Sequence, residues 1–103
     1  MGTDSLFARR LKEARDAAGV SQRQLGILAG IDEFVASARV NQYERGKHTP
    51  DYKTAERLAA VLGVPTAFFY AKDGDLAQLV RLYGLLGKRN RKRLMRQAHE
   101  LAS

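Results

Sequence analysis

The segment ASARVNQYERG, residues 36–46, gathers side chains that can recognise another molecule through hydrogen bonds. Its apolar residues recur at the spacing i, i+4, i+7, which predicts a helix that packs through Ala36, Val40 and Tyr43. At about 100° per residue, the residues that point away or flank that direction are Ser37, Ala38, Arg39, Asn41, Gln42 and Arg45. Asn and Gln amides can pair with adenine, Arg can pair with guanine, and Ala can touch a thymine methyl. This set is the candidate base-reading face, with a plain solvated helix face as the alternative.

The other reactive side chains do not form a catalytic pattern. His48 and His99 lie far apart in the chain, cysteine is absent, and neither a G-x-G-x-x-G motif nor a P-loop occurs. Asp32 and Glu33 are neighbours, but such an acidic pair is typical of a helix start rather than of a general acid and base. A lone histidine without neighbouring ligands does not form a metal site. We therefore expect a protein that is not an enzyme and that needs no cofactor or metal.

The charge of the chain favours a polyanionic partner. The formal net charge is +7 and the isoelectric point is near 10.1. The excess is uneven, because residues 71–103 hold eight Lys and Arg against three Asp and Glu. The run KRNRKRLMR, Lys88–Arg96, contains no acid. This run is interpreted first as a solvated helix face and second as extra phosphate contact; a nuclear-targeting signal is compatible only by composition.

The length of 103 residues suits one small domain with an appended element. We expect a helix-turn-helix domain in residues 1–70 and a helical extension in residues 71–103. No apolar run approaches the roughly 18 residues of a membrane-spanning helix. The charged start MGTDSLFARRLKEARD also lacks the apolar core of a signal peptide. A cytoplasmic, nucleoid-associated location is the expectation.

Hydrophobic spacing predicts two helices at the start of the chain. Thr3, Asp4 or Ser5 caps the first, which ends at Gly19. The apolar stripe of this helix is Phe7, Leu11, Ala14 and Ala18. Ser21 caps a short second helix with Gln24 in the capping-box position. The buried side of this second helix is predicted to be Leu25, Leu28 and Ala29, and Gly30 ends it.

Four more helices are predicted after residue 46. Pro50 sits near the first position of one whose apolar stripe is Tyr52, Ala55, Leu58, Ala59 and Leu62. Pro65 starts a short helix that ends in an aromatic plug of Phe68, Phe69 and Tyr70. The segment KDGD, residues 72–75, is predicted to be a linker. A sixth helix follows and stops near Gly84–Gly87, and Asn90 caps a seventh. The chain shows no strand pattern, so the predicted fold is all-α.

Two helices joined by a tight turn, the second with a polar outward face, make a helix-turn-helix, whose second helix can enter the major groove of DNA. This geometry needs a small residue within the first of the two helices, and Gly26 stands there. The stretches SQRQLGILAG, NQYERGKHTP and ERLAAVLGVP, in this order, resemble the Xre/lambda-repressor-type (Cro/C1-like) helix-turn-helix regulators. The resemblance covers about Leu6 to Tyr70 and implies a five-helix DNA-binding domain, here with one or two additional C-terminal helices.

The resemblance also implies roles for single residues. Ser21 and Gln22 match the start of the family's second helix, where polar groups meet a DNA phosphate. Arg23 beside them is a further candidate phosphate contact. The turn after the recognition helix, which the family also uses for phosphate contacts, holds Lys47, His48 and Thr49; a neutral surface role is the alternative for His48. Glu44 matches an acid that pairs with an arginine of the first helix, here Arg15, as a structural ion pair. Ser37 and Gln42 match the family's base-reading positions best. For Arg39, a contact with phosphate instead of a base is the alternative.

The resemblance implies double-stranded DNA as partner, with a homodimer on an inverted-repeat operator. The expected function is a transcriptional regulator that represses. An antitoxin-type regulator, whose C-terminal helices bind a protein toxin, is the alternative. An RNA-binding protein is disfavoured because the aromatic residues mostly lie on apolar faces. The apolar stripe between Leu76 and Leu86 is predicted either to pack on the domain or to form a dimer seam.

The chain departs from the family pattern at Asp32–Val35. Between Ser21 and Gly46 it has about four residues more than the usual pattern. Two structures could accommodate them. In one, the turn is longer and Phe34 or Val35 is tucked against the preceding helix. In the other, Asp32 caps a recognition helix that starts one turn early and points Phe34 and Val35 toward the groove. The early start is slightly favoured, because Asp32 followed by Glu33 suits a helix start.

Overall fold

The computed structural model describes residues 5–103, and in them the predicted all-α fold is confirmed. The helical segments, in chain order, are α1 (Leu6–Ala18), α2 (Gln22–Leu28), α3 (Ala36–Glu44), α4 (Tyr52–Leu62), the 3₁₀ helix η1 (Thr66–Tyr70), α5 (Gly74–Leu85) and α6 (Lys88–Ala102). The first five form the expected helix-turn-helix domain, and α5 and α6 are the additional C-terminal helices. Thr3 and Asp4, two of the three predicted caps of the first helix, lie outside the described residues.

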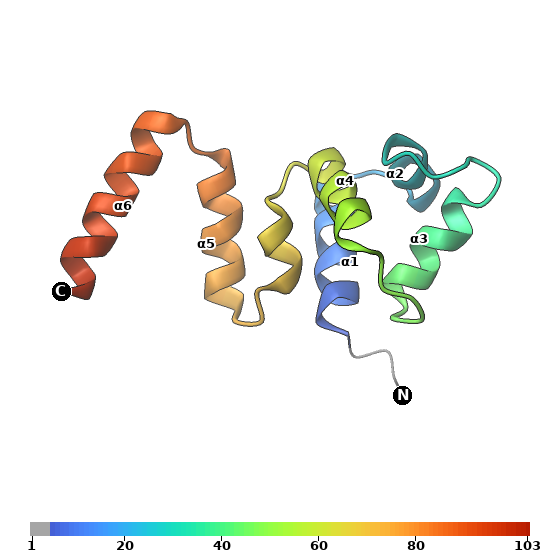
Figure 1. Ribbon diagram of the computed structural model, residues 1–103, viewed down its shortest axis with the longest axis horizontal. Helices are drawn as coiled ribbons and strands as arrows, with labels where there is room; N and C mark the ends of the chain where they lie inside the picture. Colours follow the sequence, from blue (N-terminus) through green and yellow to red (C-terminus); the bar gives the residue numbers. More distant parts are fainter. Residues whose placement is uncertain (1–4) are drawn as a thin grey trace.

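The helices are arranged along one long axis, in a molecule of 50 × 30 × 22 Å. Figure 1 shows α1 and α4 at the centre, α2 and α3 at one end, and η1, α5 and then α6 toward the other. The helix-turn-helix and the last helix therefore occupy opposite ends of the molecule.

One core joins α1, α2, α3, α4 and η1. Its largest fully buried side chains are Leu11, Leu25, Val40, Leu58 and Phe69. The ring of Phe7 lies against Phe69, with 4.9 Å between the ring centroids. Burial of apolar side chains is the main favourable term in folding, so this shared core is what sets the positions of α2 and α3.

Most predicted helix ends are found in the structure. The Ser5 hydroxyl accepts a hydrogen bond from the backbone N–H of Ala8, and Ser21 and Gln24 form the predicted capping box. Gly19 and Gly63 end α1 and α4 in the left-handed conformation, both with φ of 71°. Because glycine adopts this conformation without a Cβ penalty, the sequence marks these two ends clearly.

Several predicted core positions are exposed instead. Leu28, predicted on the buried side of α2, is 66% exposed, and Ala18 and Tyr52 are also exposed. Each of the three is the first or the last residue of its helix. Tyr70, predicted as part of the aromatic plug, is half-exposed, while Phe68 and Phe69 are buried. Pro50 precedes the Asp51 cap rather than starting α4.

The first helix of the C-terminal extension begins earlier than predicted. The KDGD segment is not a linker throughout, because Asp73 caps α5 and Gly74 is its first residue. The helix ends at Leu85, within the predicted stop near Gly84–Gly87. A Cβ on Gly84 would lie 2.8 Å from the Pro65 ring, so this glycine lets α5 approach the start of η1 closely. Asn90 does not cap the last helix, which begins at Lys88 after Gly87.

Arg10 connects the domain to this extension, and it was not singled out in the sequence. Its guanidinium is buried and donates to the carbonyl oxygens of Ala71 and Lys72, at 2.9 and 3.0 Å, and to Glu13. It also lies 5.8 Å from the centroid of the Phe68 ring. Arg10 thereby fixes the chain just before α5. None of the helices between residues 5 and 103 is long and apolar enough to cross a membrane.

Candidate nucleic-acid interface

The recognition helix α3 is placed by a close crossing with α2. Ala36, Val40 and Tyr43, the predicted inner face, are all buried. A Cβ on Gly26 would lie 2.7 Å from the Cβ of Ala36 and 3.0 Å from its carbonyl oxygen. Any side chain larger than hydrogen at position 26 would push the helices apart. The small residue required by the helix-turn-helix geometry is therefore in contact with the first turn of α3.

The four extra residues lengthen the turn and not the helix. The favoured early start of the recognition helix is wrong, because the helix begins at Ala36. The Asp32 carboxylate accepts a hydrogen bond of 2.8 Å from the N–H of Phe34, and the N–H of Val35 bonds to the Asp32 carbonyl oxygen at 3.0 Å. Asp32 thus closes a turn instead of capping a helix, as Asp side chains often do. Phe34 and Val35 are both exposed, so neither is tucked against α2.

The polar face of α3 is mostly free. Ser37, Ala38, Arg39 and Arg45 are exposed, whereas Asn41 and Gln42 are half-buried. The predicted outward face is therefore exposed at four of its six residues. The backbone carbonyl oxygen of Gln42 accepts hydrogen bonds from the N–H groups of Lys47 and His48. The turn after α3 therefore lies beside Gln42.

A polar network ties α3 to α1 and α2. Arg15 Nε and Nη2 donate to the two oxygens of Glu44, at 2.5 and 3.1 Å, so this predicted pair is bidentate in the structure. The side chains of Arg15 and Glu44 are 15% and 4% exposed. The hydrogen bond to Glu44 raises the pKa of Arg15 above its usual value. Arg15 also donates to the Val20 carbonyl oxygen, which helps to satisfy this guanidinium in its partly buried position.

Gln22 extends this network to the candidate base-reading face. Its Nε2 donates to Glu44 Oε1 at 3.0 Å and to Asn41 Oδ1 at 3.3 Å. Because Glu44 can only accept, the Gln22 amide is held in one orientation. Two groups of these amides remain available to another molecule: Oε1 of Gln22, which can accept, and Nδ2 of Asn41, which can donate. Asn41 is thus oriented by a residue of α2, a coupling that its spacing on α3 did not reveal.

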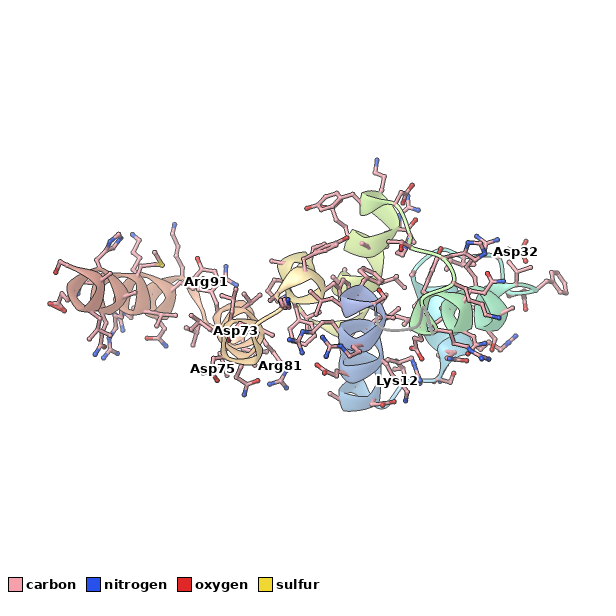
Figure 2. The ribbon with its side chains drawn as sticks, turned by 90° about the horizontal axis from the view of Figure 1, so that it is seen from below. Lys12, Asp32, Asp73, Asp75, Arg81 and Arg91 are labelled. Atoms are coloured by element: carbon pink, nitrogen blue, oxygen red, sulfur yellow. The ribbon has the colours of Figure 1, made fainter. Side chains whose placement is uncertain are left out.

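The candidate phosphate contacts divide into two groups. Ser21 and Gln22 line one shallow depression together with Arg15, Asn41, Glu44 and the candidate base-reading residue Arg45. Lys12 of α1 lines the same depression and was missed in the sequence (Figure 2); its place one turn before Arg15 was the available signal. Arg23 is exposed and pairs with Glu33 at 3.4 Å. The second group, Lys47, His48 and Thr49, is exposed in the turn after α3.

The basic run Lys88–Arg96 lies elsewhere. It forms most of α6, and Figure 1 places α6 at the end of the molecule opposite to α3. Lys88, Arg89, Lys92, Arg93 and Arg96 line a groove of their own on that helix. The fold therefore does not bring this run next to the candidate base-reading face of α3 in the same subunit.

Comparisons with known proteins agree with this geometry. The family model described as "Helix-turn-helix domain" matches residues 6–67. The crystal structure of the transcriptional regulator BswR superposes with a TM-score of 0.83 at 48% sequence identity, and the match covers 90% of this chain and 92% of that one. Two Bacillus subtilis proteins named as HTH-type transcriptional regulators are also similar. The SPbeta prophage-derived YonR is 38% identical over 63 residues, and RghRB is 37% identical over 73 residues. These matches cover 61% and 70% of this chain but only 55% and 50% of the two relatives, so the chain spans about half the length of each.

Proposed function

Since this chain belongs to the helix-turn-helix family of transcriptional regulators, we propose that it represses transcription by binding specific double-stranded DNA with α3 in the major groove. The observation that carries this proposal is the division of α3 into a fully buried inner face and a free polar face beside the start of α2. The major groove admits one α-helix, and the start of the preceding helix then meets the sugar-phosphate backbone.

The side chains are suited to that task. Asn41, oriented by Gln22, presents a donor for an acceptor on a base edge, and Arg45 can pair with guanine. Lys12 and Ser21 lie in the same depression and provide donors for phosphate oxygens. Ser37 and Ala38 in the first turn of α3 are exposed where recognition helices contact base edges.

The proposal is tested by selecting duplexes from a random library with the purified protein. We expect a short inverted repeat whose affinity falls steeply with salt, because phosphate contacts release counterions. Asn41→Ala should then lose discrimination at one or two base positions, about 1–3 kcal/mol each. Arg39→Ala is the matched control, and it should weaken binding to all sequences alike. Recovery of no sequence, or binding that is insensitive to salt, would contradict the proposal.

We also infer that the protein binds its operator as a homodimer formed through α5 and α6. Helix α5 packs on the domain through Ala77 and the Gly84 approach to Pro65. Its other side carries exposed apolar residues, namely Leu76, Leu79, Leu82 and Tyr83. Helix α6 contains no buried residue and exposes Met95 and Leu101. A second copy of the same two helices would cover both surfaces, and it would supply the twofold symmetry of an inverted repeat.

One observation favours a different occupant of this surface. Six Lys and Arg lie between Lys88 and Arg96 without an acid among them, so two copies of α6 would repel each other where these residues approach. An acidic protein partner, as in an antitoxin-type regulator, would not meet this repulsion. A light-scattering mass separates the two occupants. A dimer has twice the 11.5 kDa of the chain, and Leu79→Asp should return it to monomer. A wild-type monomer contradicts the homodimer.

A further inference from the structure

The turn between α2 and α3 presents one aromatic side chain to solvent. Phe34 is 91% exposed, more than any other large apolar side chain in residues 5–103. An isolated exposed apolar residue is ordinary on a protein surface. This one lies in the four-residue insertion that distinguishes the turn, two residues before the first residue of α3. Nothing in the core or in the polar network uses it.

The turn holds Phe34 in a defined place. The Asp32 carboxylate and carbonyl oxygen bind the N–H groups of Phe34 and Val35, at 2.8 and 3.0 Å. The end of the turn is fixed by the contact of Ala36 with Gly26, and its start by a hydrogen bond of 2.9 Å from the Ile31 N–H to the Gly26 carbonyl oxygen. Both ends of the insertion are thus attached to the same residue of α2, so the turn projects as a short, closed loop (Figure 1).

The position of this loop points to the partner. Recognition helices meet base edges through their N-terminal residues. Phe34 lies in the turn just before that end of α3. Asp32 lies at the end of the molecule that contains α3, far from Arg91 at the start of α6 (Figure 2). The two carboxylates of the loop are engaged, because Asp32 closes the turn and Glu33 pairs with Arg23 of α2.

We propose that Phe34 is a specificity-determining residue that contacts the C5-methyl group of a thymine in the major groove. This rests on the proposed function. The thymine methyl is the one apolar group that the base pairs display in that groove, and apolar side chains recognise it by contact. The contact would add selection for a T·A pair next to the positions read by Ser37 and Ala38. It gives a role to an exposed phenyl ring that neither the core nor the polar network uses.

The experiment uses the duplex recovered by the random selection with the wild-type protein. Each thymine in turn is replaced by deoxyuridine, which removes only the methyl group. We expect wild-type affinity to fall about four-fold at one thymine per half-site, the equivalent of one buried methyl group. Phe34→Ala should bind the original duplex several-fold more weakly and should show no further loss at that thymine. Because Phe34 is exposed, the variant should melt at the wild-type temperature.

Leu28→Ala is the matched control, since Leu28 is an exposed apolar residue at the end of α2. It should keep both the affinity and the uridine response. If the Phe34→Ala variant loses as much affinity with uridine as the wild-type protein does, the inference is overturned while the proposed function stays intact. Unchanged affinity of Phe34→Ala would overturn it too. Failure of the wild-type protein to select any duplex would overturn both proposals.

Discussion

The two ends of this chain use apolar residues in different ways. In α1 to η1 the large apolar side chains meet in one core, which contains Leu11, Leu25, Val40, Leu58 and Phe69. In α5 and α6 only Ala77 is buried, although the two helices carry leucines at regular spacing. The α5–α6 junction is held by polar contacts instead. Arg91 donates to the carbonyl oxygens of Tyr83 and Gly84 and lies 4.7 Å from the centroid of the Tyr83 ring.

The difference separates stability from assembly. A helix whose apolar face is covered within its own subunit contributes to the stability of that subunit, because it removes area from water. A helix that leaves this face exposed contributes only when another chain covers it. We therefore expect substitutions in the domain to change the free energy of unfolding, and substitutions in α5 and α6 to change association.

The largest expected effect is on the buried ion pair. Glu44→Ala leaves Arg15 and Gln22 without their acceptor and should lower the free energy of unfolding by about 3 kcal/mol, within the range for a broken buried pair. Urea denaturation measures this value. The control is Glu33→Ala, which breaks an ion pair whose two side chains are about 60% exposed; it should cost no more than about 0.5 kcal/mol. Equal losses in the two variants would contradict the importance of burial.

A smaller loss is expected from the α2–α3 crossing. Gly26→Ala places a methyl group 2.7 Å from the Cβ of Ala36, and overpacking of this kind costs about 1–3 kcal/mol. The double variant Gly26→Ala with Ala36→Gly should restore part of the lost stability, since it removes the Cβ of Ala36 that the new methyl group meets. Gly74→Ala in α5 meets open space and should be neutral or slightly stabilising. Thermal melting of the four proteins checks this order, and a stable Gly26→Ala protein would exclude the close approach.

The attachment of α5 should have a smaller effect still. Gly84→Ala meets the Pro65 ring at 2.8 Å and should separate α5 from η1. Because α5 contributes only Ala77 to the buried core and partly buried Val80 beside it, we expect the domain to keep its stability within about 1 kcal/mol. Amide hydrogen exchange should become faster in α5 and α6 and remain unchanged in α1 and α3. Faster exchange throughout the molecule would show that the two regions are one cooperative unit.

The smallest effect concerns acid stability. The hydrogen bonds from Thr54 lower the pKa of Asp51 below its usual value of about 3.9. A carboxyl group with a lowered pKa in the folded state contributes stability above its unfolded pKa, and this is lost as the pH falls through the folded pKa. Asp51→Asn keeps a cap of α4 but cannot titrate, so the melting temperature should fall less steeply below about pH 4. A slope equal to that of the wild-type protein would contradict this role of Asp51.

The recognition helix shows how much of the site could be predicted from the sequence. The spacing of Ala36, Val40 and Tyr43 identified its inner face, because a helix with one core has a fixed period. The ion pair of Arg15 with Glu44 was also predicted, but from the family resemblance. Lys12 and the contact between Gln22 and Asn41 were not predicted, because they join side chains of different helices. The roles of the candidate base-reading and phosphate-binding residues stay predictions.

Local chemistry in the sequence determined the helices, their capped ends and the small residue at position 26. Glycine conformation, side-chain caps and apolar period act within a few residues, so they can be read along the chain. The tertiary structure alone decided whether Asp32 would cap a helix or close a turn, since both are compatible with the same residues. The contact of Ala36 with Gly26 fixes where α3 begins, and Asp32–Val35 must then form the loop that presents Phe34. It also decided that Gly84 packs against Pro65, because that contact joins residues 19 positions apart.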